Sequence, residues 1–239
     1  LLITTPLWGA SKISQVDFEN SLSDSYSRAT FGHTGGGSYV TGRTGGYAFR
    51  TTYSPSPDGY GFTIAQPSMP DSGELYISYW RRFASNFWGN GGAPCSDSAN
   101  WNIKFLWLDS TVTSHFEMLW DALNTIYIYP AYGSHWSDGS TDTQYYSNSD
   151  FRGSWTHFEF YIKRSTGDGY NHDGIIRFWI NSTQAFNFTS VATGPITGYV
   201  SSPAIKGLCD AATGTGTWDI DDYEAWDGMP DEEEDTTPS

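Results

Sequence analysis

Residues 153–163 read GSWTHFEFYIK, and residues 173–181, after a loop rich in Gly and Asp, read DGIIRFWIN. In the first segment Phe158, Phe160 and Ile162 alternate with polar residues, and the second segment alternates in the same way. Such a period of two is typical of a strand with one buried face, because successive side chains point to opposite sides. The two segments therefore predict paired strands of an antiparallel sheet.

The same alternation recurs along most of the chain, and the period of 3.6 residues that indicates a helix is hard to find. Clusters of Gly, Pro, Asn, Asp and Ser separate the alternating segments. The candidate strands are residues 16–20, 47–53, 59–65, 74–84, 101–108, 114–121, 125–129, 155–164, 175–181, 184–189, 204–208 and 218–226. This pattern predicts an all-β fold with antiparallel sheets in a sandwich or jelly roll. Residues 31–46, rich in Gly, Ser and Thr, are predicted to form a mobile loop.

The segments 153–163 and 173–181 resemble the signature W-h-x-F-x-x-x-x-K … D-G-x-x-x-x-W of concanavalin A-like (laminin G-like) jelly rolls. That superfamily includes polysaccharide lyases, glucanases, lectins and many phage or surface proteins. Residues 74–83, ELYISYWRRF, are similar to the strand that precedes the cleft in the lyases. The resemblance implies a concanavalin A-like jelly-roll β-sandwich of about a dozen antiparallel strands. We expect one such domain over residues 1–228 and an acidic tail or linker over residues 229–239.

Composition narrows the possible functions. The chain has 239 residues, with 27 Asp and Glu against 12 Lys and Arg, and a formal net charge of −15. Binding to nucleic acid or to an anionic membrane needs clustered Lys and Arg, so the charge argues against both partners. No run of about 18 apolar residues is present, so no membrane insertion is expected. Aromatic residues make up 17% of the chain, which supplies apolar surface for a sizeable core.

Two cysteines, Cys95 and Cys209, lie in surroundings rich in Gly and Ser. Two alternatives are open for them: a disulfide that closes a long loop, or two free thiols. Two N-glycosylation sequons, at Asn181 and Asn187, are compatible with secretion. We therefore expect an extracellular location or a place on a cell or virion surface.

The polar faces of several predicted strands also carry aromatic residues. Aromatic rings stack on the apolar faces of sugar rings and polar groups bind sugar hydroxyls, so such a face suits glycan binding. The alternative is an ordinary solvated sheet face. The residues expected to bind a glycan are Tyr127, Tyr129, Tyr161, Arg177 and Trp179.

Enzymes of the superfamily need more specific groups. A glucanase carries acids at E-x-D-x-E spacing on one strand, whereas Glu117 and Asp121 have the wrong spacing and no third acid. A polyuronate lyase needs a base and a cation that neutralises the uronate carboxylate. The base candidates are Tyr161 and His115, and the cation candidates are Arg81, Lys104 and Lys163. The lyases carry a Gly-Lys-Leu-Pro-Gly-Leu-like segment, of which WNIKFLW (residues 101–107) keeps the Lys and loses the Pro-Gly.

Two acidic segments, DFE at residues 17–19 and DIDD at residues 219–222, resemble those of jelly-roll carbohydrate-binding modules. In those modules the first and last strands bring oxygen ligands together around a structural Ca²⁺, a metal that prefers carboxylate and carbonyl oxygens. The resemblance implies Glu19 and Asp221 as ligands, with Asp17 and Asp219 behind them. Alternatively, these acids face solvent at a sheet edge, where charges deter edge pairing.

The leading hypothesis is thus an extracellular, non-catalytic domain that recognises a polysaccharide or glycan. A polysaccharide (polyuronate) lyase that acts by β-elimination is the first alternative. The second alternative is a structural building block of a virion or cell-surface assembly, with self-assembly as its partner interaction. A Gly-x-Ser-x-Gly motif is absent, so serine catalysis is not expected.

Overall fold

A computed structural model describes residues 9–19, 21–23, 25, 30–33, 37–53, 62–65, 70, 72–85, 102–110, 114–121, 125–131, 144–146, 151–167, 170–193 and 216–230. All regular structure in these ranges is β-strand. The strands are β1 (Lys12–Val16), β2 (Thr30–His33), β3 (Gly37–Thr41), β4 (Tyr47–Tyr53), β5 (Phe62–Ala65), β6 (Glu74–Phe83), β7 (Asn102–Ser110), β8 (Ser114–Asp121), β9 (Ile126–Ala131), β10 (Gln144–Tyr146), β11 (Trp155–Lys163), β12 (Gly174–Ile180), β13 (Thr183–Val191) and β14 (Gly216–Trp226). Among the described residues no helix has the length and apolar character of a membrane span.

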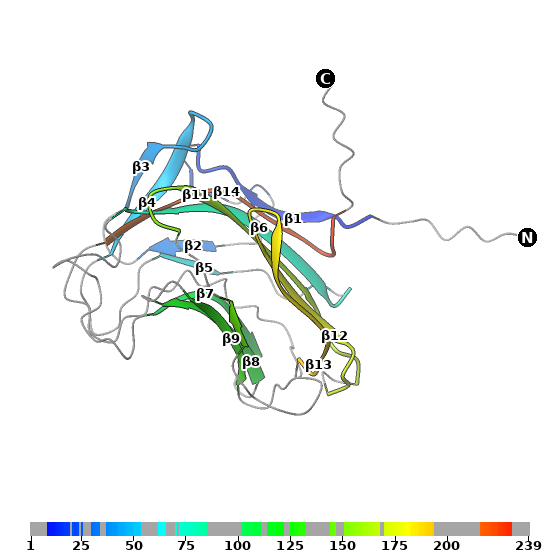
Figure 1. The fold of residues 1–239 in the computed structure, drawn as a ribbon. Helices are drawn as coiled ribbons and strands as arrows, with labels where there is room; N and C mark the ends of the chain where they lie inside the picture. The colour runs from blue at the N-terminus through cyan, green and yellow to red at the C-terminus, as the bar shows by residue number, and fades with distance from the viewer. Residues whose placement is uncertain are drawn as a thin grey trace, which may run out of the picture.

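Antiparallel pairing joins these strands into sheets. The large sheet has eight strands in the order β13-β12-β11-β6-β14-β4-β3, and β1 also pairs with β14. The small sheet has the order β10-β9-β8-β7, and β2 pairs with β5. The large sheet curves over β7, β8 and β9 of the small sheet (Figure 1). The prediction of an all-β sandwich is therefore confirmed.

The core lies between the large and the small sheet. Ile77 of β6 and Phe160 of β11 belong to the same hydrophobic cluster as Met118 of β8 and Ile128 of β9. Each of these side chains is 0% exposed. Burial of apolar surface at this scale is the main favourable contribution to folding. The alternation of apolar residues thus predicted the inward face of the large sheet correctly.

The opposite face of the large sheet, which we call the outer face, is made by the residues that alternate with the core. Across β11 and its two neighbours, Tyr161 is paired with Arg177 of β12 and with Tyr76 of β6. Glu159 is paired with Trp179 of β12. The outer face therefore combines aromatic and charged residues from strands that are distant in sequence.

Two predictions about the first fifty residues are wrong. The predicted loop at residues 31–46 contains β2 and β3, and β3 pairs with β4. A side chain at Gly37 would overlap the ring of Phe49, so this glycine allows close packing in a sheet. The predicted strand 16–20 shares only Val16 with β1, which lies earlier in the chain. The left-handed φ of 61° at Phe18 interrupts the extended backbone after β1. The predicted strand at residues 204–208 lies outside the described residues.

Candidate functional site

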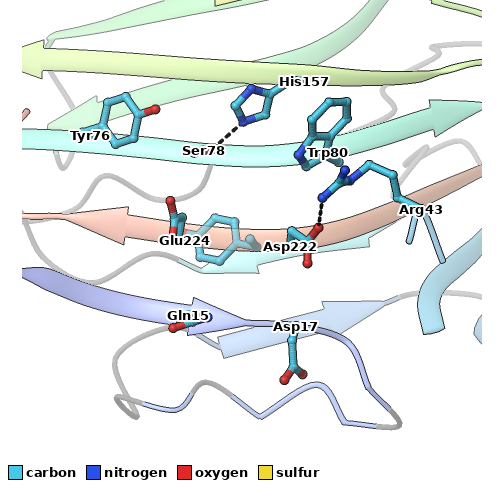
Figure 2. A pocket seen from close by; sticks show the side chains of 10 residues that line it. Gln15, Asp17, Arg43, Tyr76, Ser78, Trp80, His157, Asp222 and Glu224 are labelled. Atoms are coloured by element: carbon cyan, nitrogen blue, oxygen red, sulfur yellow. Dashed lines mark hydrogen bonds and ion pairs between the residues drawn. The ribbon is translucent and has the colours of Figure 1, made fainter. Parts of the chain in front are cut away.

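A pocket with a volume of about 430 Å³ opens on the outer face of the large sheet (Figure 2). Its lining residues on β6 and β14 are Tyr76, Ser78, Trp80, Asp222, Tyr223 and Glu224. The remaining lining residues are Gln15, Asp17, Arg43 and His157. The pocket thus joins strands from both ends of the described chain to the centre of the large sheet.

The pocket lies where β14 changes its pairing partner. One edge of β14 pairs with β4 up to Ile220, and the same edge pairs with β1 from Tyr223 onward. Between these halves, Asp221 lies opposite Trp80 and Glu224 lies opposite Ser78, so β14 carries one extra residue in a bulge. Bulges redirect side chains and bend the strand locally. Asp222, within this bulge, has a left-handed φ of 48° and lines the pocket.

Trp80 occupies the centre of the site, between His157 and Arg43 (Figure 2). The His157 ring is stacked on the Trp80 ring with centroids 4.7 Å apart and an interplanar angle of 15°. The guanidinium carbon of Arg43 lies 4.3 Å from the Trp80 ring centre, within the range of a cation–π contact. Both contacts fix the orientation of the indole ring.

A hydrogen-bonded network lies beside this stack. The Ser78 hydroxyl and His157 Nε2 are 2.7 Å apart, and His157 Nδ1 lies 3.5 Å from a carboxylate oxygen of Glu159. The Tyr76 hydroxyl donates a hydrogen bond of 2.6 Å to the other Glu159 oxygen. Burial lowers the pKa of His157 and the Arg43 charge lowers it further, whereas Glu159 opposes the shift. Burial and the bond to Glu159 raise the pKa of Tyr76, which keeps the phenol protonated.

Arg43 connects the turn between β3 and β4 to the bulge of β14. Its backbone N–H donates to Asp221 Oδ2 at 2.8 Å, and its guanidinium forms an ion pair of 2.8 Å with Asp222. Burial raises the pKa of Asp221 to about 6, the Asp222 charge adds to this shift, and the two backbone N–H groups that donate to Asp221 oppose it. Glu224 forms an ion pair of 2.7 Å with Lys12 of β1.

Three of the predicted glycan-binding residues lie together on the outer face, on β11 and β12 beside the pocket. The guanidinium carbon of Arg177 is 5.7 Å from the Tyr161 ring centre, and Arg177 Nε donates to Asn187 Oδ1 at 3.0 Å. Trp179 is half-buried, beside Glu159 in the neighbouring strand. The structure therefore brings Tyr161, Arg177 and Trp179 into one neighbourhood with the pocket.

Tyr127 and Tyr129 occupy a different sheet. Both lie on β9, where they alternate with the buried Ile126 and Ile128. The predicted glycan-binding residues are consequently divided between the two layers of the sandwich. Sequence alternation assigns residues to one of two faces, but it does not tell which strands share a sheet.

The predicted lyase residues are also divided. Tyr161 donates a hydrogen bond of 2.7 Å to Glu74, and burial together with this bond raises its pKa, which disfavours the phenolate form. Lys163 lies on the same face, 3.4 Å from Glu74. Arg81 is 1% exposed and lies in the interior, with its guanidinium carbon 3.7 Å from the Trp218 ring centre. Burial lowers the pKa of Arg81 to about 9.

The other lyase candidates lie on the small sheet, where the backbone fixes their register. Lys104 of β7 is opposite Leu119 of β8, and Leu119 is opposite Tyr127 of β9. Tyr127 is in turn opposite Tyr145 of β10, so these residues form one row across the sheet. His115 lies on β8, opposite Ala131.

The predicted calcium ligands meet the turn between β3 and β4. Glu19 accepts a hydrogen bond of 2.9 Å from the Tyr47 N–H, and Asp221 accepts the bond from Arg43. Asp17 accepts a bond of 3.1 Å from the Glu19 N–H. In the described parts of the chain, no three His, Cys, Asp or Glu side chains come together as metal ligands do. Carboxylate oxygens of Glu19 and Asp221 nevertheless approach the same turn.

Asp219 has a separate place in the sheet. It is 2% exposed and binds Arg50 of β4 and Arg82 of β6, each at 2.7 Å. Both of its carboxylate oxygens therefore have cationic partners. Cys95 and Cys209 lie outside the described residues.

The sequence prediction did not single out the residues that line the pocket on β6. Alternation within residues 74–83 places Tyr76, Ser78 and Trp80 on the face opposite the core residues Leu75 and Ile77, and this signal was present in the sequence. The role of Arg43 could not be found in this way, because its approach to Trp80 depends on how β14 joins its neighbours.

No family model and no curated protein matches the sequence. Several solved structures are similar. Domain 4 of AbnA, a GH43 extracellular arabinanase from Geobacillus stearothermophilus solved with arabinotriose, matches with 17% identity and a TM-score of 0.54, over 93% of this chain and 95% of that one. The alginate lyase Aly36B, solved as a mutant with alginate trisaccharide, matches with 15% identity and a TM-score of 0.50, over 90% and 97% of the two chains.

The binding domain of botulinum neurotoxin serotype D/C matches with 12% identity and a TM-score of 0.57. The match covers 92% of this chain and 50% of that chain, so the protein spans about half the length of the neurotoxin domain. The chain shares the jelly-roll β-sandwich fold of these structures. The predicted resemblance is thereby confirmed at the level of architecture, and the pocket lies on the outer face of the larger sheet of this jelly roll.

Proposed function

We propose that the protein is an extracellular glycan-recognition domain and that the outer-face pocket binds a sugar unit of a polysaccharide or glycan. The observation that carries this proposal is the pocket itself, in which Trp80 and the largely buried Tyr76 lie beside several hydrogen-bonding side chains. Carbohydrate sites combine apolar rings with polar groups that fix the orientation of the hydroxyls. The neighbouring Arg177 and Trp179, both half-buried beside the buried Tyr161, add groups of the same kind for further sugar units.

The similar structures support the same class of function. Arabinotriose and an alginate trisaccharide accompany two of the solved chains, whose folds match this one. A shared fold does not by itself transfer a function, so the proposal depends on the pocket.

Retention on immobilised polysaccharides tests this proposal. A panel of neutral, amine-bearing and uronate polysaccharides is run in affinity electrophoresis with the wild type, Trp80→Ala and the control Trp155→Ala. Trp155 is half-buried on the same sheet near Arg82 and does not line the pocket. We expect retention on at least one polysaccharide, its loss in Trp80→Ala and its preservation in Trp155→Ala. Absence of retention across the panel, or retention by Trp80→Ala, would contradict the proposal.

A second candidate function is β-elimination on a polyuronate at the small sheet. The backbone register that aligns Lys104, Tyr127 and Tyr145 in one row across this sheet supports it, since this chemistry needs both a cation and a base. The base removes the proton next to the uronate carboxylate, a double bond forms in the sugar ring as the glycosidic C–O bond breaks, and the leaving oxygen takes up a proton from water or from the protonated base. Ultraviolet absorbance of the unsaturated product should rise in the wild type, fail to rise in Lys104→Ala and Tyr127→Phe, and persist in the control Tyr161→Phe.

A structural Ca²⁺ at the turn between β3 and β4 completes the proposal. The side chains of Glu19 and Asp221 would hold it together with carbonyl oxygens of the chain, because Ca²⁺ prefers hard oxygen ligands. Asp219 is left out of this ligand set, since Arg50 and Arg82 bind both of its oxygens. The ion would stabilise the contact between β14 and the turn that carries Arg43.

A further inference from the structure

The lining of the outer-face pocket carries more negative than positive groups. Three carboxylates line it, from Asp17, Asp222 and Glu224, against one guanidinium, from Arg43. Arg43 is bound to Asp222 at 2.8 Å, so its charge is offset locally. His157 adds no compensating charge near neutral pH, because burial favours its uncharged form. The lining therefore has a net negative charge.

Three of the polar side chains in this lining can only accept hydrogen bonds. Carboxylates accept hydrogen bonds and donate none, and the phenol of Tyr76 already donates to Glu159. The Trp80 ring is in contact with both His157 and Arg43, which limits how much of its surface a sugar ring can cover. Recognition in this pocket thus depends on a ligand that donates hydrogen bonds to carboxylates.

We infer that the pocket prefers an amino sugar with a free, protonated amine, such as a glucosamine unit, over its N-acetylated form and over a uronate. This inference rests on the proposed function and specifies the substrate class of the same site. An ammonium group offers three donors and a positive charge to the carboxylates of this lining, Glu224 among them. A uronate instead places a carboxylate beside carboxylates, which costs free energy in a partly desolvated pocket.

Lys12 of β1 provides an internal test of the inference. Its ammonium group lies 2.7 Å from Glu224 and 4.9 Å from the Trp226 ring centre, and Lys12 does not line the pocket. Lys12 thus partly neutralises the carboxylate that a bound amine would contact. Removal of the Lys12 charge should strengthen amine binding, and removal of the Glu224 charge should weaken it.

The experiment uses calorimetric titration of the whole protein at pH 6.0 with three tetrasaccharides: glucosamine, N-acetylglucosamine and galacturonate oligomers. We expect the glucosamine oligomer to bind about fivefold more tightly than its acetylated counterpart. The ratio of the glucosamine affinity to the N-acetylglucosamine affinity should fall toward one in Glu224→Gln and in Asp17→Asn. The same ratio should rise in Lys12→Gln. A control, Asp173→Asn, makes the same charge change in a distant loop, where Asp173 binds Thr166, and should leave the ratio unchanged.

The outcomes distinguish failure of the amine preference from failure of the proposed function. Equal or tighter binding of the acetylated or the uronate oligomer, or an amine preference that persists in both Glu224→Gln and Asp17→Asn, overturns the inference. If the acetylated oligomer then binds and loses affinity in Trp80→Ala, the proposed function stands without the amine preference. If none of the three oligomers binds, the amine preference falls, and retention on the polysaccharide panel decides the proposed function separately. Melting curves of each variant establish that it is folded before its affinity is compared.

Discussion

Arg43 reaches across the sheet to Trp80, with its guanidinium carbon 4.3 Å from the centre of the indole ring. The two residues belong to elements that are not neighbours in the sheet, because β14 lies between β4 and β6. An ion pair with Asp222 and the backbone bond to Asp221 hold Arg43 in this position. The turn between β3 and β4 consequently forms a wall of the pocket.

Arg43→Ala removes the side-chain contacts that connect the turn between β3 and β4 to Trp80 and Asp222. We expect a loss of about 1 kcal/mol in the free energy of unfolding, because a cation–π contact and a partly exposed ion pair each contribute modestly. Glycan retention should fall along with it. Urea denaturation and affinity electrophoresis measure the two effects. Arg43→Lys keeps the charge near Asp222 but not the planar group, so it should give an intermediate result; wild-type behaviour in both variants would contradict the role of the stack.

Asp219 should matter more for stability than any other acid on the outer face. Asp219→Asn removes a buried carboxylate that holds two arginines, and we expect it to cost about 2 kcal/mol or more in unfolding free energy. Asp222→Asn is the matched control, because the Asp222 side chain is 42% exposed and its ion pair should be worth about 0.5 kcal/mol. Equal losses of unfolding free energy in the two variants, measured by urea denaturation, would contradict the idea that burial makes the Asp219 ion pairs more stabilising than that of Asp222.

Much of the fold could be predicted because it depends on local alternation. Phe158, Phe160 and Ile162 were assigned to one face of a strand, and all three are 0% exposed in the core. The prediction failed where glycine was taken as a sign of a loop, since Gly37 lies in a strand and makes room for Phe49. Composition alone does not distinguish a flexible glycine from one required by close packing.

The site was harder to predict, because it depends on strand order. Tyr161 and Trp179 were chosen for their residue type, and β11 and β12 place them on the outer face. Tyr127 was chosen by the same reasoning and lies in the other sheet. The pocket lies where β14 changes its pairing partner from β4 to β1. The acidic run at residues 219–222 is the local sequence feature at this position.

Removal of calcium tests the proposed metal site. We expect EDTA to lower the melting temperature of the wild type and excess Ca²⁺ to restore it, because an ion that binds only the folded state stabilises it. Glu19→Gln should lose this response, whereas Glu74→Gln, which changes an acid bound to Tyr161, should keep it. An EDTA-insensitive melting curve would contradict the metal site.

The pH dependence of stability tests the environment of His157. Burial, with Arg43 in support, lowers its pKa in the folded state below the ordinary value of about 6.5, while Glu159, Glu224 and Asp222 act in the opposite direction. Between the folded and unfolded pKa values the unfolded chain binds more protons, so stability rises with pH. The contribution of His157 is therefore fully present above about pH 6.5 and is lost as the pH falls through its folded pKa.

His157→Gln should accordingly flatten the pH dependence. Unfolding free energies of the wild type and the variant are measured by urea denaturation between about pH 5 and 7, where one fully shifted group changes stability by at most about 1.4 kcal/mol per pH unit. Asp221 also titrates here, with a pKa of about 6, but it is present in both proteins and its effect cancels in their difference. A difference that grows as the pH rises agrees with a lowered pKa. A difference of the opposite sign would mean that Glu159, 3.5 Å from His157 Nδ1, outweighs burial and holds the ring protonated.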